Sequence, residues 1–264
     1  LLSGKMAVKE WPTSFYGIGN DTDPDNKEKF TETMFQVSVD AAFRIKKGLF
    51  AGIGYSLRYG EIDPEDPVGR LASRANPVPG SGTTLTSTLG TVFRLDTRDN
   101  HFYPSRGSLH RLTIDTSVKG FASDFGFTRY SIDLRKYLAI HERQVLAVQA
   151  VVEGTAGTVP FRLLPSVGGV MRGYSSVRYI DRNLIALQLE YRYVPLFWRV
   201  GFVAFAGVAD VFDRPADLAF DTIKYTAGLG IRFQFSRSEK INIRLDYGIG
   251  RDSSGDYIDL NEAY

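Results

Sequence analysis

The acidic residues near the start of the chain have the spacing of a calcium-binding loop without its other requirements. Asp21, Asp23 and Asp25 are followed by Glu32, eleven residues after Asp21. A loop of the EF-hand type needs a glycine in its middle, and its last glutamate enters a helix. Here Asn26 occupies the glycine position and Glu32 falls in a predicted strand. We interpret the segment as a solvated acidic loop and predict no metal site.

Other patterns that support catalysis or cofactor binding are misplaced or missing in the sequence. The runs Gly17-Ile18-Gly19 and Gly228-Leu229-Gly230 do not open a helix, so they cannot aim backbone N–H groups at a phosphate. The sequence has no G-x-S-x-G nucleophile motif, no cysteine and only 3 scattered histidines. His110 lies near Asp115 in sequence without a paired serine or cysteine. We therefore predict a non-enzymatic protein with no catalytic residue and no cofactor.

The charge balance and hydropathy exclude two further classes of protein. The chain has 32 Lys+Arg against 30 Asp+Glu, a formal net charge of +2, whereas a nucleic-acid surface needs clustered positive charge. Its longest uncharged apolar stretch is Val200–Ala209. A membrane-spanning helix needs about 20 such residues. We expect neither a nucleic-acid partner nor an α-helical membrane protein.

The hydrophobic pattern repeats every two residues. In Ile241–Gly250 every second residue is apolar, and the alternate positions hold Asn242, Arg244, Asp246 and two glycines. This alternation is typical of a strand with one apolar and one polar face. The pattern recurs along the chain, and no segment keeps a helical period. The sequence therefore predicts an all-β protein.

The predicted strands suit a membrane better than a soluble sandwich. Many run for 10 to 16 residues, whereas globular strands average about 5–6 residues. Their polar faces carry both signs of charge, as in Arg129, Asp133 and Arg135. Transmembrane barrel strands need about 9–11 residues, turn apolar side chains outward and carry aromatic girdles. The 18 Phe and 14 Tyr fit such girdles, so a membrane barrel is favoured and a soluble β-protein is the alternative.

About twelve strands account for the pattern. They are predicted near residues 1–12, 30–46, 49–60, 83–98, 106–118, 124–140, 142–156, 183–194, 198–212, 222–236, 240–250 and 256–264. The connections after the second, sixth and tenth strands are short, and those after the first, third and seventh are long. Outer-membrane barrels have short periplasmic turns and long outer loops. The even count and the loop lengths predict one closed antiparallel barrel domain over residues 1–264, with both termini on the periplasmic side.

Two segments resemble motifs of a known family. Leu95–Ser108, LDTRDNHFYPSRGS, is similar to a turn between barrel strands of the bacterial surface antigen family. The loop near residues 157–182 is similar to that family's lid loop, whose V-R-G-F/Y hallmark stands here as Met171-Arg172-Gly173-Tyr174. Essentially the whole chain therefore resembles the barrel domain of the outer-membrane insertase and translocase superfamily, which includes barrel-assembly proteins of the Bam and Tam type.

The resemblance implies a barrel in the bacterial outer membrane with a lid loop folded inward. Family barrels usually have more strands and follow periplasmic POTRA domains, whereas neither extra strands nor a POTRA domain is predicted here. The sequence is then either a fragment or a short form of the family. The regular alternation of loop lengths favours a short form with a closed barrel.

The resemblance also implies a partner for Arg172. Lid arginines of the family reach acidic groups on the strands that follow, and Glu190 lies on the polar face of the first such strand. Gly207 stands where the family usually has a second acidic residue, and we expect it to make room for the loop tip. An uncompensated charge inside a barrel is costly, so we expect an Arg172–Glu190 ion pair, with Gly173 allowing a tight backbone and Tyr174 packed below. The alternative is a solvent-exposed loop arginine.

The end of the sequence resembles the terminal strand signal that the barrel-assembly machinery reads. Ile258, Leu260 and Tyr264 stand at alternating positions, with Tyr264 in place of the more usual Phe or Trp. This similarity implies that the barrel-assembly machinery inserts the chain. The surrounding partners are then outer-membrane lipid and lipopolysaccharide.

These observations predict a role in outer-membrane biogenesis or transport. The barrel would insert, translocate or organise proteins or lipids, using a weak seam between its first and last strands that pairs with a client strand or with a second copy in a homodimer. Two alternatives stay open at this point. One is a passive pore for small solutes, and the other is an anchor or secretion barrel for an N-terminal passenger.

Overall fold

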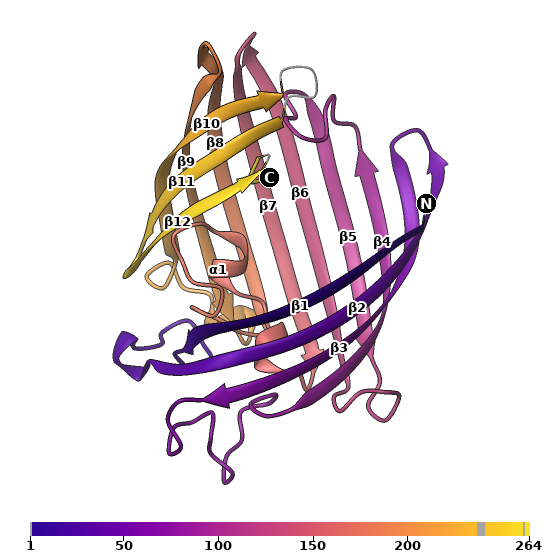
Figure 1. Cartoon of the computed structure of the whole chain (residues 1–264), viewed down its shortest axis with the longest axis vertical. Coiled ribbons are helices and arrows are strands. Elements are labelled where there is room, and N and C mark those ends of the chain that lie inside the picture. The colour runs from indigo at the N-terminus through magenta and orange to yellow at the C-terminus, as the bar shows by residue number, and fades with distance from the viewer. Residues whose placement is uncertain (1, 237–240, 261) are drawn as a thin grey trace.

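The chain forms one antiparallel sheet whose strands follow each other in sequence order (Figure 1). The computed structural model describes residues 2–236, 241–260 and 262–264. Each strand is hydrogen-bonded to its neighbours in the chain, so every connection is a hairpin. The strands are β1 Leu2–Phe15, β2 Glu28–Lys46, β3 Leu49–Pro64, β4 Thr84–Asp96, β5 Gly107–Ser117, β6 Phe127–His141, β7 Gln144–Gly157, β8 Asn183–Phe197, β9 Val200–Phe212, β10 Lys224–Ser236, β11 Ile241–Gly250 and β12 Ser253–Leu260.

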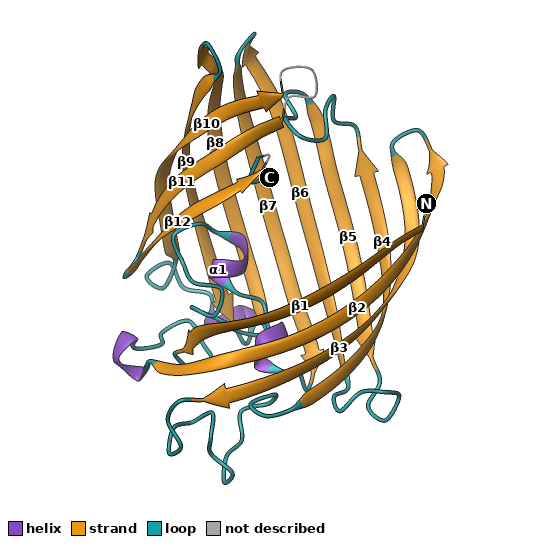
Figure 2. Cartoon of the chain, in the orientation of Figure 1, coloured by secondary structure: helices purple, strands orange, loops and turns teal. Residues whose placement is uncertain are grey.

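The predicted all-β barrel architecture is confirmed, with each expected strand present and most ends shifted by a few residues. The helical elements are single turns in the loops: η1 Pro24–Asn26, η2 Phe161–Leu163, α1 Val167–Val170 and η3 Pro215–Asp217 (Figure 2). None of the helices in the described residues is long and apolar enough to cross a membrane.

The loop lengths alternate as predicted. β2 and β3 are joined at residues 47–48 and β6 and β7 at residues 142–143, whereas residues 65–83 and 158–182 form long loops. The long loops lie at one end of the strands, at the bottom of Figure 1. The short connection expected at 237–239 lies outside the described residues. The two ends are called the short-turn end and the long-loop end below.

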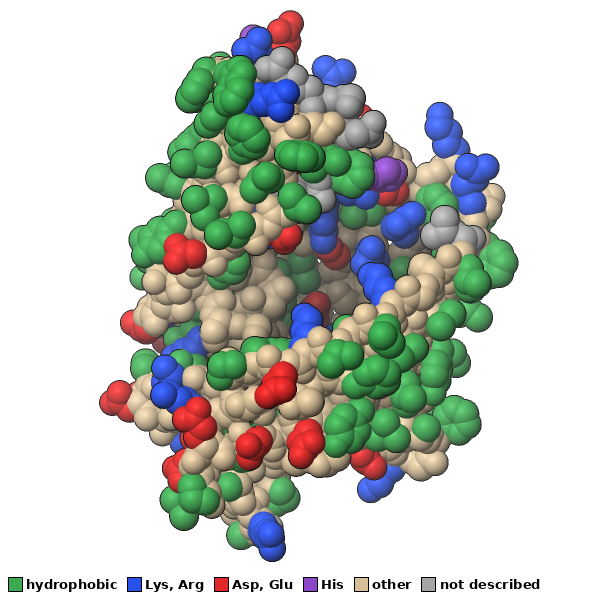
Figure 3. Space-filling model, in the orientation of Figure 1, with side chains coloured by type: hydrophobic (Ala, Val, Ile, Leu, Met, Phe, Trp, Pro, Cys, Tyr) green, Lys and Arg blue, Asp and Glu red, His purple; other side chains and the backbone are tan. Residues whose placement is uncertain are grey.

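The two faces of the sheet differ as the alternation requires. Phe35, Val37 and Val39 on β2, like Leu187 and Leu189 on β8, are exposed on the outer face. The space-filling view shows apolar side chains gathered on this outside and cations in the hollow (Figure 3). An apolar outer band and a polar interior are what a lipid-embedded barrel needs.

The sheet does not close, which differs from the prediction. Within the described residues β1 pairs only with β2, and β12 pairs only with β11. The gap between these two edge strands, called the seam here, is visible in Figure 1. β12 ends at Leu260 and runs for 8 residues, against 14 for β1. Alternation marks a strand and its faces, but it carries no information on whether an edge finds a partner.

The outward face of β10 provides a test of the membrane-embedded fold. Leu229 lies near the middle of β10 and Tyr225 near its end, and both are exposed on the outer face. We expect Leu229→Arg to lower the free energy of unfolding by about 2–4 kcal/mol, and Tyr225→Arg by about 0–1 kcal/mol, because the cost of an arginine falls away from the bilayer midplane. Reversible denaturant unfolding in lipid vesicles measures both. Equal costs at the two positions would contradict a membrane-spanning β10.

Candidate functional site

The lid loop, residues 158–182, folds into the barrel at the long-loop end and carries the α1 turn that is labelled in Figure 1. The base of its tip is closed by a bridge between Ser166 and Ile180 and by a bond from Val167 N to Tyr179 O of 3.0 Å. The Ser166 hydroxyl caps α1 by accepting from Gly169 N. These bonds close the loop into a compact tip, as the inward-folded lid of the prediction requires.

The tip is held by apolar packing against the strands that follow it. Val167 and Met171 join a buried cluster that includes Leu184 on β8 and Val211 on β9. A Cβ atom at Gly207 would lie 3.2 Å from the Met171 sulfur. Gly207 therefore makes room for the loop tip, as expected from the sequence.

Arg172 lies at the centre of the site and is paired on two sides. Its Nη2 donates to Glu190 Oε2 at 2.5 Å, the contact expected from the sequence. Its Nη1 donates to Asp246 Oδ2 on β11 at 2.6 Å, a partner that the sequence reasoning missed. The guanidinium also stacks on the ring of Phe205, 3.5 Å from its centroid. The alternative of a solvent-exposed arginine is excluded, because the residue is 6% exposed.

The partners of Arg172 belong to a larger set of buried charges. Arg192 Nε donates to Glu190 at 2.7 Å, Arg232 Nε donates to Glu262 at 2.8 Å, and Arg232 also bonds Asp246. Side chains of these residues are at most 2% exposed. The lumen network is defined as these residues together with the lid arginine: Arg172, Glu190, Arg192, Arg232, Asp246 and Glu262. Its three cations and three anions compensate one another, which a buried charge requires.

Gly173 and Tyr174 seat the loop tip against the last strands. Gly173 has a φ of +96°, and a Cβ atom there would lie 3.1 Å from Gly250 N, so only glycine allows this approach. Its N–H donates to the Tyr257 hydroxyl on β12 at 2.7 Å. Burial raises the pKa of Tyr174 to about 12, and its hydroxyl donates to Tyr225 O at 2.6 Å.

A second arm of the lid loop reaches the opposite side of the seam. Arg162 pairs with Glu32 on β2 at 2.6 Å, and Arg58 on β3 pairs with the same carboxylate at 2.5 Å. Next to it the Phe161 ring meets those of Phe15 and Phe30, with centroids 5.1 and 5.7 Å away. Glu32 is thus an ion-pair residue inside the barrel. The sequence reasoning missed this second arm, because nothing local links residue 32 with residue 162.

The lid loop therefore contacts both sides of the seam. Arg162 holds it to β2 and β3, and Arg172 holds it to β8 and β11. The strands on the two sides share no backbone bonds across the seam in the described part of the chain. The loop is thus a bridge that sets the spacing between the two halves of the sheet.

The predicted terminal signal is only partly in place. Ile258 and Leu260 lie in β12 and are exposed on the outer face, at 77% and 59%. Tyr264 lies beyond the end of β12 and is buried inside the barrel, so it does not share the outward face of Ile258 and Leu260. Its backbone oxygen accepts from Arg192 at 2.5 Å, and the Arg172 guanidinium lies 5.7 Å from its ring centroid. The lumen network draws the tail inward, which ends the alternation.

Comparison with known proteins decides the family. A family model described as the Omp85 superfamily domain matches residues 2–259. The chain belongs to the Omp85 superfamily. It is a β-barrel protein of the bacterial outer membrane.

Solved structures are similar to this Omp85 barrel at low sequence identity. BamA from Haemophilus ducreyi lacking POTRA domains 1-3 is similar with a TM-score of 0.63 and 14% identity, over 98% of this chain and 57% of that chain. An outer membrane channel from Pseudomonas putida F1 has a TM-score of 0.46 at 10% identity, covering 98% of this chain and 92% of that one. The toluene transporter TodX from Pseudomonas putida has a TM-score of 0.44 at 12% identity, covering 97% and 76%. No curated protein sequence matches the chain.

The ion pairs of the lid provide a first test in this Omp85 barrel. We expect Arg172→Ala and Glu190→Gln to lower the free energy of unfolding, Arg172→Ala by about 3–5 kcal/mol, because it removes one of the cations that neutralise the buried carboxylates of Glu190 and Asp246. The double variant should cost less than the sum by about 0.5–3 kcal/mol. Arg182→Ala is the matched control, because this lid arginine pairs with Asp213 on the exposed surface and should cost no more than about 1 kcal/mol. Strict additivity in denaturant unfolding would show that the pair does not couple.

The glycine of the lid motif gives a second test. We expect Gly173→Ala to destabilise the Omp85 barrel by about 1–3 kcal/mol, because it combines a positive φ with a close backbone approach. Gly169→Ala is its control, since the atom closest to an added Cβ there is 3.7 Å away. The unfolding temperatures of the two variants, measured by circular dichroism, test this expectation. A Gly173→Ala protein as stable as Gly169→Ala would rule out this seating of the tip.

Proposed function

We propose that this Omp85 barrel acts in outer-membrane biogenesis or transport by offering the free edge of β1 to a strand of another protein. The observation that carries the proposal is the seam, where β1 presents one edge of its 14 residues without a strand partner among the described residues. Unpaired backbone donors and acceptors are costly in lipid, and an incoming strand satisfies them. Strand addition of this kind gives affinity through main-chain hydrogen bonds, which form whatever side chains the client strand carries.

The two sides of the seam are unequal, which supports β1 as the receiving edge. β12 has 8 residues, and its inner side is tied to the lid through the Tyr257 hydroxyl. β1 is longer, and its apolar side chains Leu2, Met6 and Val8 are exposed on the outer face. A client strand paired with β1 therefore continues the apolar outer surface.

The lid loop supports a non-enzymatic role in which the barrel is a rigid frame. Its two arms fix the separation of the edges, so a client strand can pair without collapse of the seam. The lid fills the interior at the long-loop end, and the lumen network occupies the space beyond it along β8, β10 and β11, which argues against a passive pore. We also propose that residues 1–264 act as one barrel domain, inserted by the barrel-assembly machinery and surrounded by outer-membrane lipid and lipopolysaccharide.

The proposal predicts that the barrel accelerates the folding of a client barrel. Purified protein in lipid vesicles is mixed with a urea-unfolded outer-membrane barrel, and the folded fraction is followed by its heat-dependent mobility on gels. We expect faster folding than in empty vesicles. Equal rates in the two vesicle preparations would overturn the proposal, and steady ion conductance in planar bilayers would favour the pore instead.

Proline substitutions on β1 test the edge itself. Successive N–H groups of a strand point to opposite sides, so of Ala7→Pro and Val8→Pro one removes a donor from the free edge and the other removes a bond to β2. We expect the free-edge variant to keep the unfolding midpoint and to slow client folding roughly fivefold, the worth of about one hydrogen bond. The other variant is the control, with a lowered midpoint. Normal client folding by both variants would contradict the use of this edge.

A further inference from the structure

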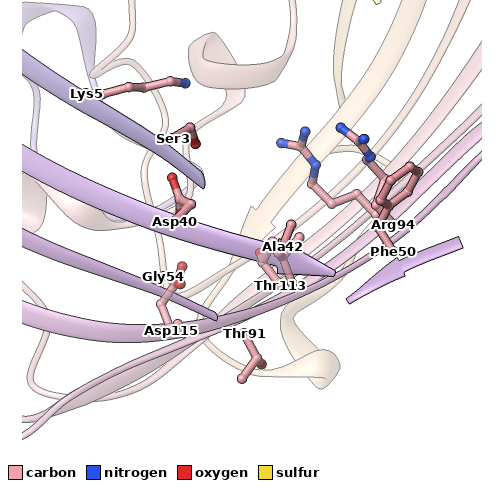
Figure 4. A pocket seen from close by; sticks show the side chains of 13 residues that line it. Ser3, Lys5, Asp40, Ala42, Phe50, Gly54, Thr91, Arg94, Thr113 and Asp115 are labelled. Carbon is pink, nitrogen blue, oxygen red and sulfur yellow. The ribbon is translucent and has the colours of Figure 1, made fainter. Parts of the chain in front are cut away.

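A cavity of about 360 Å³ lies on the inner face of β1 to β5, apart from the lid loop. Its lining includes Ser3 and Lys5 on the edge strand β1, so it borders the seam. The close-up shows these two residues and Asp40 on neighbouring strands, with Arg94 beside Phe50 further along the cavity (Figure 4). Cations also line the hollow in the space-filling view (Figure 3). The proposed pairing of a client uses the backbone edge of β1 and none of the side chains that line this cavity.

One end of the cavity holds two arginines without a carboxylate partner. Arg94 on β4 and Arg111 on β5 are direct register partners, and like charges in such positions repel. Within the described residues neither forms an ion pair within 4.0 Å, and Arg94 Nε is buried without a hydrogen-bond partner. Asp133 lies opposite Arg111 on β6, but Arg135 already binds both of its oxygens. Arg94 and Arg111 therefore have no anion bound to them among the described residues.

The arginine end is also fixed in place. The Arg94 guanidinium lies 4.7 Å from the centroid of the Phe50 ring, and Phe50 is its register partner on β3. A cation seated on an aromatic face loses little further freedom when an anion binds. Each guanidinium presents a planar pair of N–H donors that matches two phosphate oxygens. The two arginines can therefore bind one phosphate together.

The other end of the cavity holds two carboxylates that converge over a pair of glycines. Asp40, Gly54, Gly90 and Asp115 form one row across β2 to β5. A Cβ atom at Gly54 would collide with Asp40 Oδ1, and one at Gly90 would collide with Asp115 Oδ1, so each carboxylate lies over its neighbouring glycine. In the part of the chain that the structure describes, neither carboxylate has an ion pair or hydrogen-bond donor. Arg129 is the register partner of Asp115 and Lys5 lines the same cavity, but among the described residues neither cation lies within 4.0 Å of these carboxylates, so no direct ion pair neutralises them.

The two ends are close enough for one ligand to reach both. The row of Arg94 and Arg111 lies four positions from that of Asp40 and Asp115 along β4 and β5, counted from Arg94 to Gly90 and from Arg111 to Asp115. At the rise of a strand this is about 14 Å between backbone positions, and side chains leaning along the strands shorten the path. The ligand must therefore carry an anion at one end and a cation at the other. Inorganic phosphate satisfies only the arginines, and a metal cation satisfies only the carboxylates.

We propose that this cavity binds the zwitterionic headgroup of a phospholipid, with its phosphate on Arg94 and Arg111 and its ammonium group on Asp40 and Asp115. The acyl chains leave through the seam beside Ser3 and Lys5 and stay in the bilayer. Gly54 and Gly90 have no side chains, so the cavity has space for the ammonium group at this point. The barrel would thus hold a lipid at its open edge.

The test measures lipid binding to the barrel of residues 1–264 in detergent by native mass spectrometry and calorimetry. The probes are short-chain phosphatidylethanolamine, short-chain phosphatidylglycerol and inorganic phosphate. We expect Arg94→Gln/Arg111→Gln to weaken binding of both lipids by about tenfold or more, the loss of at least one charge-assisted contact. Asp40→Asn/Asp115→Asn should weaken only phosphatidylethanolamine, so that the preference between the lipids is lost or reversed.

Matched variants keep the outcome decisive. Arg106→Gln/Arg143→Gln removes the same net charge from exposed turns and should leave lipid binding unchanged. Arg94→Lys/Arg111→Lys keeps the charge if the glutamine variant fails to fold, and it should retain partial binding. Phosphatidylethanolamine and phosphatidylglycerol binding equally to the unaltered barrel would overturn the zwitterion assignment. Inorganic phosphate binding as tightly as the lipids would reduce the cavity to a simple anion site.

Discussion

The backbone of a strand in lipid has no water to bond with, and this constraint shapes the whole molecule. Every strand from β2 to β11 meets it by pairing on both sides with its neighbours in the chain. β1 and β12 meet it on one side only within the described residues. The seam is therefore the place where the fold leaves a requirement unmet, and it is also where the lid loop and the cavity beside β1 are found.

Buried charge supplies the second level of organisation. The lumen network joins the lid, β8, β10, β11 and the tail through ion pairs between buried groups of opposite charge. Glycines make this network possible, because Gly228 lies under the Phe205 ring on which Arg172 stacks. On the other side of the seam, Glu32 forms ion pairs with both Arg58 and Arg162. The lid thus replaces the missing strand pairing with side-chain contacts.

The interior is divided into two parts with different character. On the inner face of β8, β10 and β11 the charges are matched within the chain, and the lid fills the space at the long-loop end. On the inner face of β2 to β5, Arg94 and Arg111 face one another, and Asp40 and Asp115 lie over glycines without an ion-pair partner in the described residues. Charges that the chain compensates itself stabilise the frame, whereas charges left uncompensated beside an open edge mark a place for a ligand.

The sequence alone was enough to predict the strands, their two faces, the alternation of loop lengths and the inward lid. Those features depend on local periodicity and on short motifs, which neighbouring residues decide. The Arg172–Glu190 contact was also predictable, because Glu190 lies on the inward face of the first strand after the lid. Asp246 was visible as an inward residue, but nothing local showed that β11 brings it to the same depth as the lid arginine.

Only the tertiary structure decided that the sheet stays open, that Arg162 reaches Glu32, and that Tyr264 turns into the lumen. Each of these outcomes depends on contacts between residues far apart in the chain, whose energies no local pattern contains.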